Sequence, residues 1–163
     1  MTEDEVYVRA KRLLREQGWD ILGGQPPRGT DSLPVIEVKS PDVIDKGSFM
    51  ALKPDLVALK KGILLLVECK PVHNDQDVDK LRRLLGDARR LDALGGELDS
   101  RGLLARTGHT LTSLPLSVRG AVAHAGTVVP MPDLATLHMA DAGRIVEPMA
   151  PDSLFVAAIR SSR

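Results

Sequence analysis

Aromatic side chains and cysteine are nearly absent from this sequence. The aromatic residues make up 2% of the chain and are Tyr7, Trp19, Phe49 and Phe155. Stacking of bases on aromatic platforms, the usual way of gripping single-stranded nucleic acid, is therefore poorly supplied. The one cysteine, Cys69, excludes an internal disulfide bond. We expect a protein of the reducing cytoplasm.

Net charge and long apolar runs are also lacking. Lys and Arg balance Asp and Glu at 22 each, so the overall field gives no sign of a polyanionic partner. A neutral total can still contain a basic face. The longest apolar run, residues 63 to 67, is far too short to span a bilayer. The acidic N-terminus is unlike the basic start of a secretory signal, and we expect no membrane attachment.

The size and composition of the chain are those of one folded domain. Its 163 residues are enough for one sizeable core and demand no second domain. Hydrophobic residues make up 43% and charged residues 27%, as in ordinary globular proteins. We therefore expect a single domain over residues 1–163.

Hydrophobic periodicity predicts an α/β fold, with a central mixed β-sheet flanked by helices. Residues 3–17 and 74–94 have the three- and four-residue spacing of amphipathic helices. Residues 56–67 read as two apolar strands around a turn at 60–62, where glycine supplies a positive φ. Further segments are predicted as strands at 19–22, 33–38, 118–124 and 144–146, loops at 23–32 and 41–48, a long connection at 95–115 and a short helix at 133–139, with 154–159 apolar and unassigned.

Ionisable residues gather at the end of this predicted hairpin. Residues two apart in a strand project to the same side, so Glu68 and Lys70 are expected on one face and Cys69 on the other. Asp55 opens the preceding strand, and the tight turn brings it beside Glu68. Hard oxygen ligands of this kind suit Mg²⁺, with Mn²⁺ as a substitute, and the Cys69 carbonyl is a further candidate ligand.

Such a centre fits phosphodiester hydrolysis. A bound metal polarises the phosphate and the attacking water, while Lys70 would position or help to deprotonate that water and offset developing negative charge. The pattern of Pro54-Asp55, twelve residues, then Glu68-Cys69-Lys70 resembles the PD-(D/E)xK nuclease superfamily. The resemblance covers about the first ninety-five residues.

The resemblance implies a restriction-endonuclease-like αβββαβ core in about residues 1–130, with residues 131–163 as a C-terminal elaboration. It implies that Asp55 and Glu68 bind the metal and that Lys70 is the catalytic lysine. Many members place a glutamate of the first helix near the metals. Glu3 lies on the apolar side of that helix and is favoured over Glu5, which faces Arg9. Some members add a glutamine after the lysine, for which Gln76 is a loose match.

Other interpretations of these residues remain open. A second Glu-x-Lys occurs at Glu37-Val38-Lys39, but no apolar hairpin precedes it and its Pro-Asp pair, residues 41–42, follows it. In the alternative interpretation, a salt bridge at the strand end links an acid to a lysine among Asp55, Glu68 and Lys70. Such a bridge contributes little stability. The four histidines show no zinc spacing, although His124 ends a predicted strand.

Basic residues near the hairpin are candidates for phosphate contacts. Lys53 is the best placed of them. Arginines recur on the helix after the hairpin at residues 82, 83, 89 and 90, where a solvated face balanced by Asp79 and Asp87 is the favoured interpretation. Cys69 is expected to be a small core residue rather than a nucleophile.

The leading functional hypothesis is a Mg²⁺-dependent DNA endonuclease of restriction, defence or repair type. One alternative keeps the nuclease fold as a nucleic-acid-binding or assembly module that does not cleave. Another is a resolvase specific for four-way junctions. A homodimer is expected by analogy, because one small domain usually needs a second copy to cut both strands. RNA remains open as substrate, as does a partner protein that supplies specificity.

Overall fold

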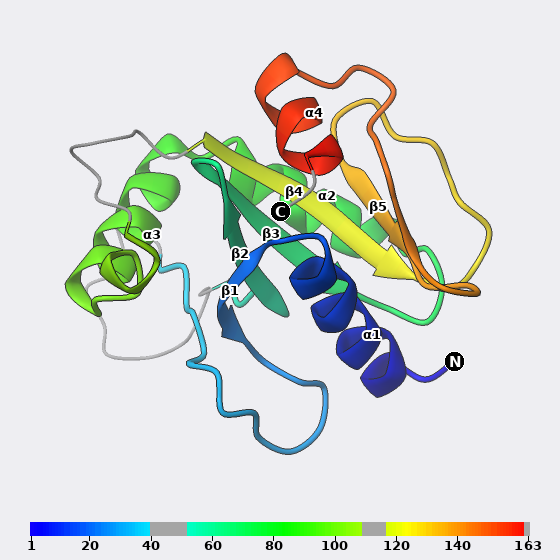
Figure 1. The fold of residues 1–163 in the computed structure, drawn as a ribbon, viewed down its shortest axis with the longest axis horizontal. Helices are drawn as coiled ribbons and strands as arrows, with labels where there is room; N and C mark the ends of the chain where they lie inside the picture. Colours follow the sequence, from blue (N-terminus) through cyan, green and yellow to red (C-terminus); the bar gives the residue numbers. More distant parts are fainter. Residues whose placement is uncertain (40–51, 109–116, 162–163) are drawn as a thin grey trace.

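One six-stranded mixed β-sheet forms the centre of the molecule (Figure 1). The computed structural model describes residues 1–39, 52–108 and 117–161. The strands lie side by side in the order of the chain, from β1 to β6. Helices cover both faces of the sheet, so the predicted α/β architecture is confirmed. No helix in these ranges is long and apolar enough to cross a membrane.

The first three strands are antiparallel and include the predicted hairpin. They are β1 (Asp20–Gly24), β2 (Leu56–Lys60) and β3 (Ile63–Cys69). The hairpin turn consists of Lys61 and Gly62, whose φ angles of 49° and 77° are both positive. A two-residue turn with this geometry matches the twist of the two strands that it joins. The hairpin register is thereby fixed, with Lys60 opposite Ile63 and Leu56 opposite Val67.

The other three strands extend the sheet beyond β3. They are β4 (Ser117–His124), which is parallel to β3, β5 (Ala135–His138), which is parallel to β4, and β6 (Arg144–Val146), which is antiparallel to β5. The register places Cys69 beside Ala123 and His124 beside His138. The carboxyl ends of β3, β4 and β5 therefore lie at the same edge of the sheet.

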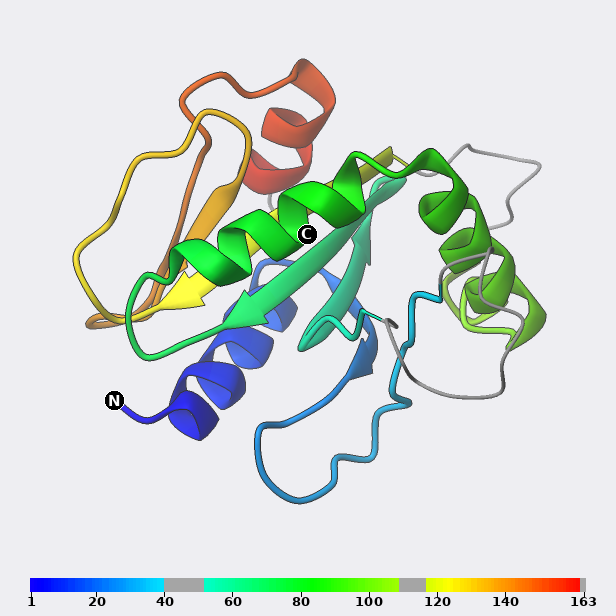
Figure 2. The same ribbon diagram turned by 180° about the vertical axis from the view of Figure 1, so that it is seen from behind.

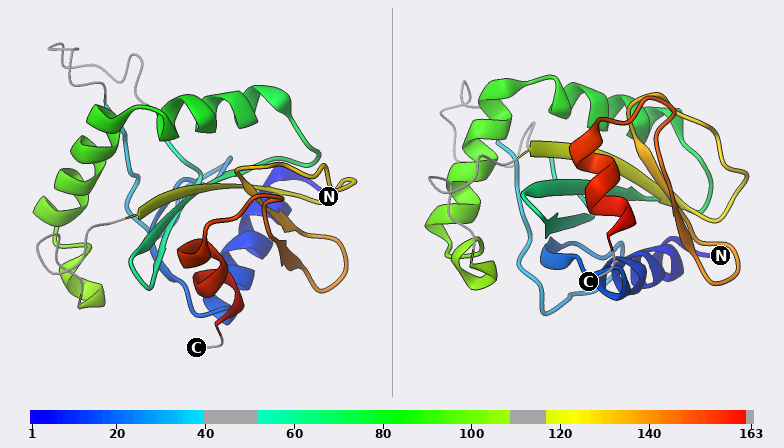
Figure 3. Two further views of the ribbon diagram at one scale, coloured as in Figure 1. Left: turned by 90° about the horizontal axis from the view of Figure 1, so that it is seen from above. Right: turned by 45° about the horizontal axis from the view of Figure 1, so that its top comes forward.

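Helices α1 (Glu3–Glu16) and α4 (Ser153–Arg160) cover one face. Figure 3 shows both on the same side of the sheet, opposite α2. The N-terminus of α1 is a capping box, in which Thr2 accepts from the Glu5 N–H and the Glu5 side chain accepts from the Thr2 N–H. Reciprocal capping satisfies amide groups that the first turn leaves without partners. Glu5 is thus a capping residue and Glu3 is left for the site.

Helices α2 (Asp75–Leu85) and α3 (Ala88–Ser100) pack on the opposite face, where α2 runs along β3 and β4 (Figure 2). The sequence predicts one helix over 74–94, but the chain breaks it at Gly86 and Asp87. Gly86 closes α2, and the Asp87 side chain accepts from the Arg90 N–H to start α3. A new N-cap stabilises a new helix axis. Residues 95–100 are therefore helical and not a connection.

Strand β3 is buried on both faces. Leu65 and Cys69 belong to the core under α1 and α4, whereas Leu64 and Leu66 belong to the core under α2 and α3. All seven residues of β3 are buried. Strands covered by helices on both faces have this near-continuous apolar sequence. The apolar run that stands out in the sequence is therefore a central strand of the sheet.

Two other expectations about elements are wrong. The strand predicted at 33–38 is a loop, in which only Val38 forms an isolated bridge, with Leu52. The helix predicted at 133–139 is instead strand β5, because Ala135 to Leu137 are buried between neighbouring strands. The unassigned segment 154–159 is part of α4. The loop predicted at 41–48 and part of the connection at 95–115 lie outside the described residues.

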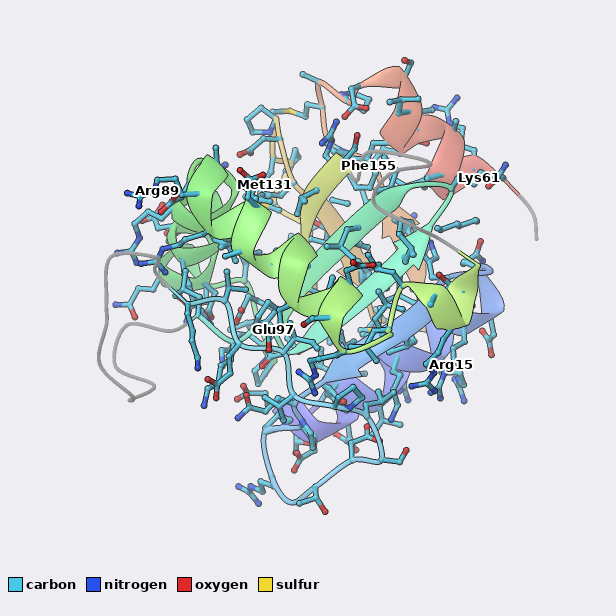
Figure 4. All side chains as sticks on the ribbon, turned by 90° about the vertical axis from the view of Figure 1, so that its left-hand side faces the viewer. Arg15, Lys61, Arg89, Glu97, Met131 and Phe155 are labelled. Atoms are coloured by element: carbon cyan, nitrogen blue, oxygen red, sulfur yellow. The ribbon has the colours of Figure 1, made fainter. Side chains whose placement is uncertain are left out.

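The turn end of the hairpin is fastened to the helices on the α1 face. Lys60 Nζ donates to the Gln17 carbonyl at 2.5 Å and to the Ser161 carbonyl at 2.7 Å. Figure 4 shows Lys61 of this turn on the same side of the molecule as α4, which carries Phe155. Lysine near the carboxyl ends of helices offsets their exposed carbonyl groups. Hydrogen bonds thus hold the turn end of the hairpin, and the ionisable residues gather at its opposite end.

Candidate functional site

Asp55 lies at the end of the hairpin opposite its turn. It precedes Leu56, which pairs with Val67, so the antiparallel register carries Asp55 to the level of Glu68. Asp55 Oδ2 accepts a hydrogen bond of 2.7 Å from the Cys69 N–H. The backbone at the end of β3 therefore fixes the Asp55 carboxylate beside the Glu-x-Lys segment.

Glu68 is a buried carboxylate at the end of an apolar strand. Its side chain is 4% exposed, and it follows Leu64 and Leu66 on the face covered by α2. Lys80 of α2 donates a hydrogen bond of 2.8 Å from Nζ to Glu68 Oε1. A carboxylate so deeply buried requires a partner of this kind. The salt bridge that the sequence left open as an interpretation thus involves Lys80 and not Lys70.

Lys70 comes directly after β3, and its ammonium group lies with the opposite layer. Alternation predicts a shared face for Glu68 and Lys70, but Lys70 Nζ forms an ion pair with Glu3 of α1. That prediction is wrong for the charged end of the side chain, because Lys70 has left the strand and alternation no longer directs it. Glu3, favoured over Glu5 from the sequence, does lie at the site.

Cys69 has the environment expected of a core residue. It is fully buried in the layer under α1, and burial raises the pKa of its thiol well above the ordinary value. A thiol that stays protonated is a poor nucleophile. The part of Cys69 that meets the site is its backbone, through the N–H that binds Asp55.

Both hairpin carboxylates resist ionisation. Burial raises the pKa of Asp55 to about 6, against the opposing effects of the Cys69 N–H and the two lysines. Burial, followed by the negative charge of Asp55, raises the pKa of Glu68 to about 7 in spite of its bond to Lys80. Raised pKa values mean that the surroundings offer too little positive charge for two anions withdrawn from water. An additional cation would be favourable at this point.

Lys70 keeps its positive charge in this arrangement. Partial burial lowers its pKa, but the hydrogen bond and charge of Glu3, with the charges of Asp77 and Asp55, outweigh burial and raise the pKa above the ordinary value. An ammonium held by a carboxylate is a donor and an electrostatic group rather than a base. In this state Lys70 is suited to orienting a water molecule or stabilising an anion.

Asp77 brings a further carboxylate into the neighbourhood. It lies in the first turn of α2, and its charge adds to the effects of burial and of Asp55 that raise the pKa of Glu68. Its Oδ2 is buried and has no hydrogen-bond partner in the part of the chain that the structure describes. The lysines 70 and 80 thus stand among four carboxylates, those of residues 3, 55, 68 and 77. The site has a local excess of negative charge although the whole chain is neutral.

The donor set fits a hard divalent cation. Mg²⁺ binds through one or two carboxylates and keeps several water molecules. Asp55 and Glu68 supply two adjacent carboxylates, of which Glu68 is buried and Asp55 is partly buried. The Cys69 carbonyl belongs to the residue whose N–H already binds Asp55. Over residues 1–39, 52–108 and 117–161 no group of three or more His, Cys, Asp or Glu side chains is arranged to hold a metal ion. A centre built from two carboxylates, a carbonyl and water does not need such a group.

The residues predicted to contact nucleic acid lie beside the site and not within it. Lys53 pairs with Glu37 of the second Glu-x-Lys segment, at 3.1 Å. The Gln76 N–H donates to the Asn74 side chain, which caps α2. Gln76 also borders an open surface hollow of about 620 Å³, together with Asp79, Arg82 and Arg83. Their contacts with nucleic acid remain predictions.

The arginines of α2 and α3 form ion pairs with acidic neighbours. Arg82 makes a bidentate pair with Asp133, at 2.8 and 2.9 Å. Arg90 pairs with Asp87 at 3.2 Å. These pairs agree with a solvated face on which acidic residues balance the arginines. Asp133, the partner of Arg82, comes from a distant part of the chain and not from the helix itself. Figure 4 shows Arg89 on α3, in the second of the two helices into which the predicted helix is divided.

Three histidines lie in a chain at the carboxyl ends of the strands. The ring centroid of His124 is 5.8 Å from that of His73 and 6.3 Å from that of His138. His124 is buried, and neither ring nitrogen has a hydrogen-bond partner among the described residues. Burial, followed by the charges of His73 and His138, lowers the pKa of His124. Burial thus favours the neutral ring, and His124 packs as a core side chain. His109 lies outside the described residues.

Lys80 and Asp77 were missed from the sequence. Both lie on the helix after the hairpin, outside its buried stripe of Val78, Leu81 and Leu84. Their approach to Glu68 depends on where α2 runs along β3, which is a tertiary feature with no local pattern. The one available signal is the unpaired buried Glu68 itself, which requires a cation from some other element.

No protein-family model, no curated protein and no solved structure matches this chain.

Proposed function

We propose that this protein is a Mg²⁺-dependent nuclease that hydrolyses phosphodiester bonds in DNA. The observation that carries the proposal is the pair of adjacent carboxylates at the open end of the β2–β3 hairpin, where Glu68 is buried and Asp55 is partly buried. Asp55 Oδ2 accepts a hydrogen bond of 2.7 Å from the Cys69 N–H. Burial, followed by the negative charge of Asp55, raises the pKa of Glu68. Buried acids that are short of positive charge favour a divalent cation.

We further propose that the fold is of the restriction-endonuclease-like type. Its support is the order of elements, in which α1 precedes the antiparallel β1, β2 and β3, and a helical segment leads from β3 to the parallel strand β4. This is the αβββαβ order expected from the resemblance. Strands β5 and β6 and helix α4 extend the sheet and cover its α1 face.

Each residue of the site would have its own role in hydrolysis. Asp55 and Glu68 would hold Mg²⁺, with the Cys69 carbonyl as a third ligand. The ion, when bound, makes water more acidic and neutralises charge on the phosphate. Lys70, held by Glu3, keeps its proton and donates a hydrogen bond to the attacking water or to a phosphate oxygen. Glu3 thus orients Lys70, which takes no hairpin carboxylate as its ion-pair partner.

A second function, nucleic-acid binding or assembly without cleavage, has one observation in its favour. Glu68 and Lys70 both have charged partners already, in Lys80 and Glu3. A site whose charges are paired internally is stable without a metal. A measurement of metal binding therefore distinguishes the nuclease from the function without cleavage.

Calorimetry with Mg²⁺ and Mn²⁺ tests the proposal. We expect saturable binding by the wild-type chain and its loss in Asp55→Asn, because one of two carboxylate ligands is removed. The matched control is Asp92→Asn, an exposed aspartate of α3, which should bind as wild type does. Absence of binding by the folded wild-type chain would favour the function without cleavage.

A substrate screen then tests the kind of nucleic acid. Duplex DNA, four-way junctions, single-stranded DNA and RNA are incubated with the protein and Mg²⁺. We expect cleavage of DNA that is lost in Lys70→Ala, and a homodimer by light scattering. Preferred cleavage of junctions would identify a resolvase. Equal cleavage by Lys70→Ala would contradict the proposed role of the lysine.

A further inference from the structure

Lys80 is the cation that neutralises the most buried carboxylate of the site. Its Nζ lies 2.8 Å from Glu68 Oε1, and the side chains are 28% and 4% exposed, respectively. The lysine comes from α2, which runs over the ends of β3 and β4, whereas Glu68 comes from the strand below. One end of this ion pair is therefore locked in the sheet and the other is close to solvent.

The pair occupies the same carboxylate that a metal ion would need. Burial raises the pKa of Asp55, and the Cys69 N–H, Lys70 and then Lys80 lower it, so Lys80 acts on both hairpin carboxylates. A divalent ion held between Asp55 and Glu68 would therefore lie close to the Lys80 ammonium. Two cations at this distance repel one another strongly where water is partly excluded. Metal binding and the Lys80–Glu68 pair compete for one negative charge.

Lys70 does not compete for the Glu68 carboxylate. Its partner is Glu3, and each of these side chains is 33% exposed. The Lys70 ammonium pairs with Glu3 of α1, whereas the Lys80 ammonium pairs with Glu68. The two lysines of the site therefore have different tasks, although both are paired with a carboxylate.

We infer that Lys80 is an exchangeable counter-cation, which holds Glu68 while the site lacks metal and is released to a phosphate of the nucleic acid when a divalent ion binds. This inference rests on the proposed function. The released ammonium keeps its charge and its long flexible side chain, and it stands next to the metal to which the phosphate is drawn. Lys80 then acts as a positioning residue for the substrate rather than as a ligand or base.

Metal affinity gives the first test. In calorimetry with Mn²⁺ on the full chain, Lys80→Met removes the competing charge and should tighten binding by on the order of tenfold. Lys80→Arg keeps the charge and should remain within about twofold of wild type. The matched control is Lys61→Met at the opposite end of the hairpin, which makes the same change in net charge and should leave Mn²⁺ affinity unaltered. A structural role for Lys80 alone predicts weaker binding in Lys80→Met.

Nucleic-acid affinity gives the second test, with an effect of opposite sign. A fluorescent DNA duplex is titrated with protein in Ca²⁺, to limit hydrolysis, and again in EDTA. Lys80→Met should bind the duplex about fivefold more weakly than wild type in Ca²⁺, because a phosphate contact is lost. In EDTA, where Lys80 stays on Glu68, the two proteins should bind alike. An equal loss in both conditions would overturn the exchange.

The outcomes separate this inference from the proposed function. If wild type binds Mn²⁺ and Lys80→Met binds it equally or more weakly, the inference fails and the proposed function stands. If neither protein binds Mn²⁺, both fail. If only Lys80→Met binds, Lys80 is a blocking cation, and the wild-type chain is not metal-dependent. Should Lys80→Met fail to fold, Lys80→Gln replaces it, because the amide retains a hydrogen bond to Glu68 without the charge.

Discussion

The tripeptide Glu-x-Lys occurs twice in this chain, in surroundings that differ in almost every respect. Glu68-Cys69-Lys70 ends a fully buried strand, and all three residues have partners from other elements. Glu37-Val38-Lys39 lies in a loop, where Val38 forms an isolated bridge and Glu37 pairs with Lys53. The side chain of Glu37 is 29% exposed and that of Glu68 is 4% exposed.

The difference comes from what precedes each copy. An apolar hairpin leads to the second copy and returns Asp55 beside it. The first copy follows a loop that is tied to α1 by Asp31, which accepts from Tyr7 at 2.9 Å and from Lys11 at 2.5 Å. A short motif therefore carries chemistry only where strands bury it and bring a second carboxylate. The predictions below test this contrast between the two copies.

The largest expected effect is on cleavage. Glu68→Gln removes a buried charge that the metal needs, and we expect cleavage of DNA to fall by on the order of 10²- to 10³-fold. Glu37→Gln makes the identical change in the loop copy and should remain within about twofold of wild type. Initial rates in Mg²⁺ measure both. Comparable losses in the two variants would remove the distinction between the copies.

Stability should show the same contrast in the core beneath each copy. Leu66 is fully buried in β3, two residues before Glu68, and Leu66→Ala should lower the free energy of unfolding by about 3 kcal/mol. Val35 lies two residues before Glu37 and is 40% exposed, so Val35→Ala should cost less than about 0.5 kcal/mol. Urea unfolding followed by circular dichroism measures both values. Equal costs would show that the loop is packed as firmly as the strand.

The turn that builds the hairpin should be sensitive to loss of glycine. Gly62 has a φ of 77°, and Gly62→Ala should destabilise the fold by about 1 kcal/mol because a side chain is strained in this conformation. Gly96 lies within α3 with open space around it, and Gly96→Ala should stabilise by about 0.5 to 1 kcal/mol. Thermal unfolding checks both signs. A stabilising Gly62→Ala would speak against the positive-φ turn.

The smallest effect concerns the loop that carries the first copy, and it depends on pH. The hydrogen bond from Lys11 lowers the pKa of Asp31 to about 2, with burial opposing and Tyr7 assisting. A lowered pKa stabilises the folded state above the ordinary value of 3.8, and this contribution is lost as the pH falls through about 2. The difference in unfolding free energy between wild type and Asp31→Asn should therefore shrink from pH 5 to pH 2. A difference that is constant over this range would exclude an ionised Asp31 as its source.

The hairpin was predictable because its information is local. Two apolar runs and a Lys-Gly turn between them fix β2, β3 and their register without knowledge of the rest. The same locality explains why Asp55 and Glu68 were brought together correctly. Strand β5 was mistaken for a helix because it has only four residues, and its three consecutive buried residues show no alternation.

The partners of the charged residues were less predictable, because they depend on how helices pack on the sheet. Lys80 reaches Glu68 only because α2 lies over the end of β3. Lys70 turns to Glu3 because its backbone has already left the strand. The break at Gly86 was visible as a glycine followed by a capping aspartate, but the apolar stripe continued across it. Sequence reasoning thus identifies the acids of the site better than it identifies their counter-ions.

The position of β3 also determines the order in which the protein can be assembled. One neighbour, β2, is connected to it by a two-residue turn, whereas the other, β4, begins only at Ser117. On the ribosome the hairpin can therefore form while the second edge of β3 still lacks its partner and apolar groups remain uncovered. Pairings between distant segments form slowly, and an unpaired apolar edge invites association with other chains. The interval between synthesis of Cys69 and of Ser117 is thus the period in which the nascent chain most needs protection from aggregation.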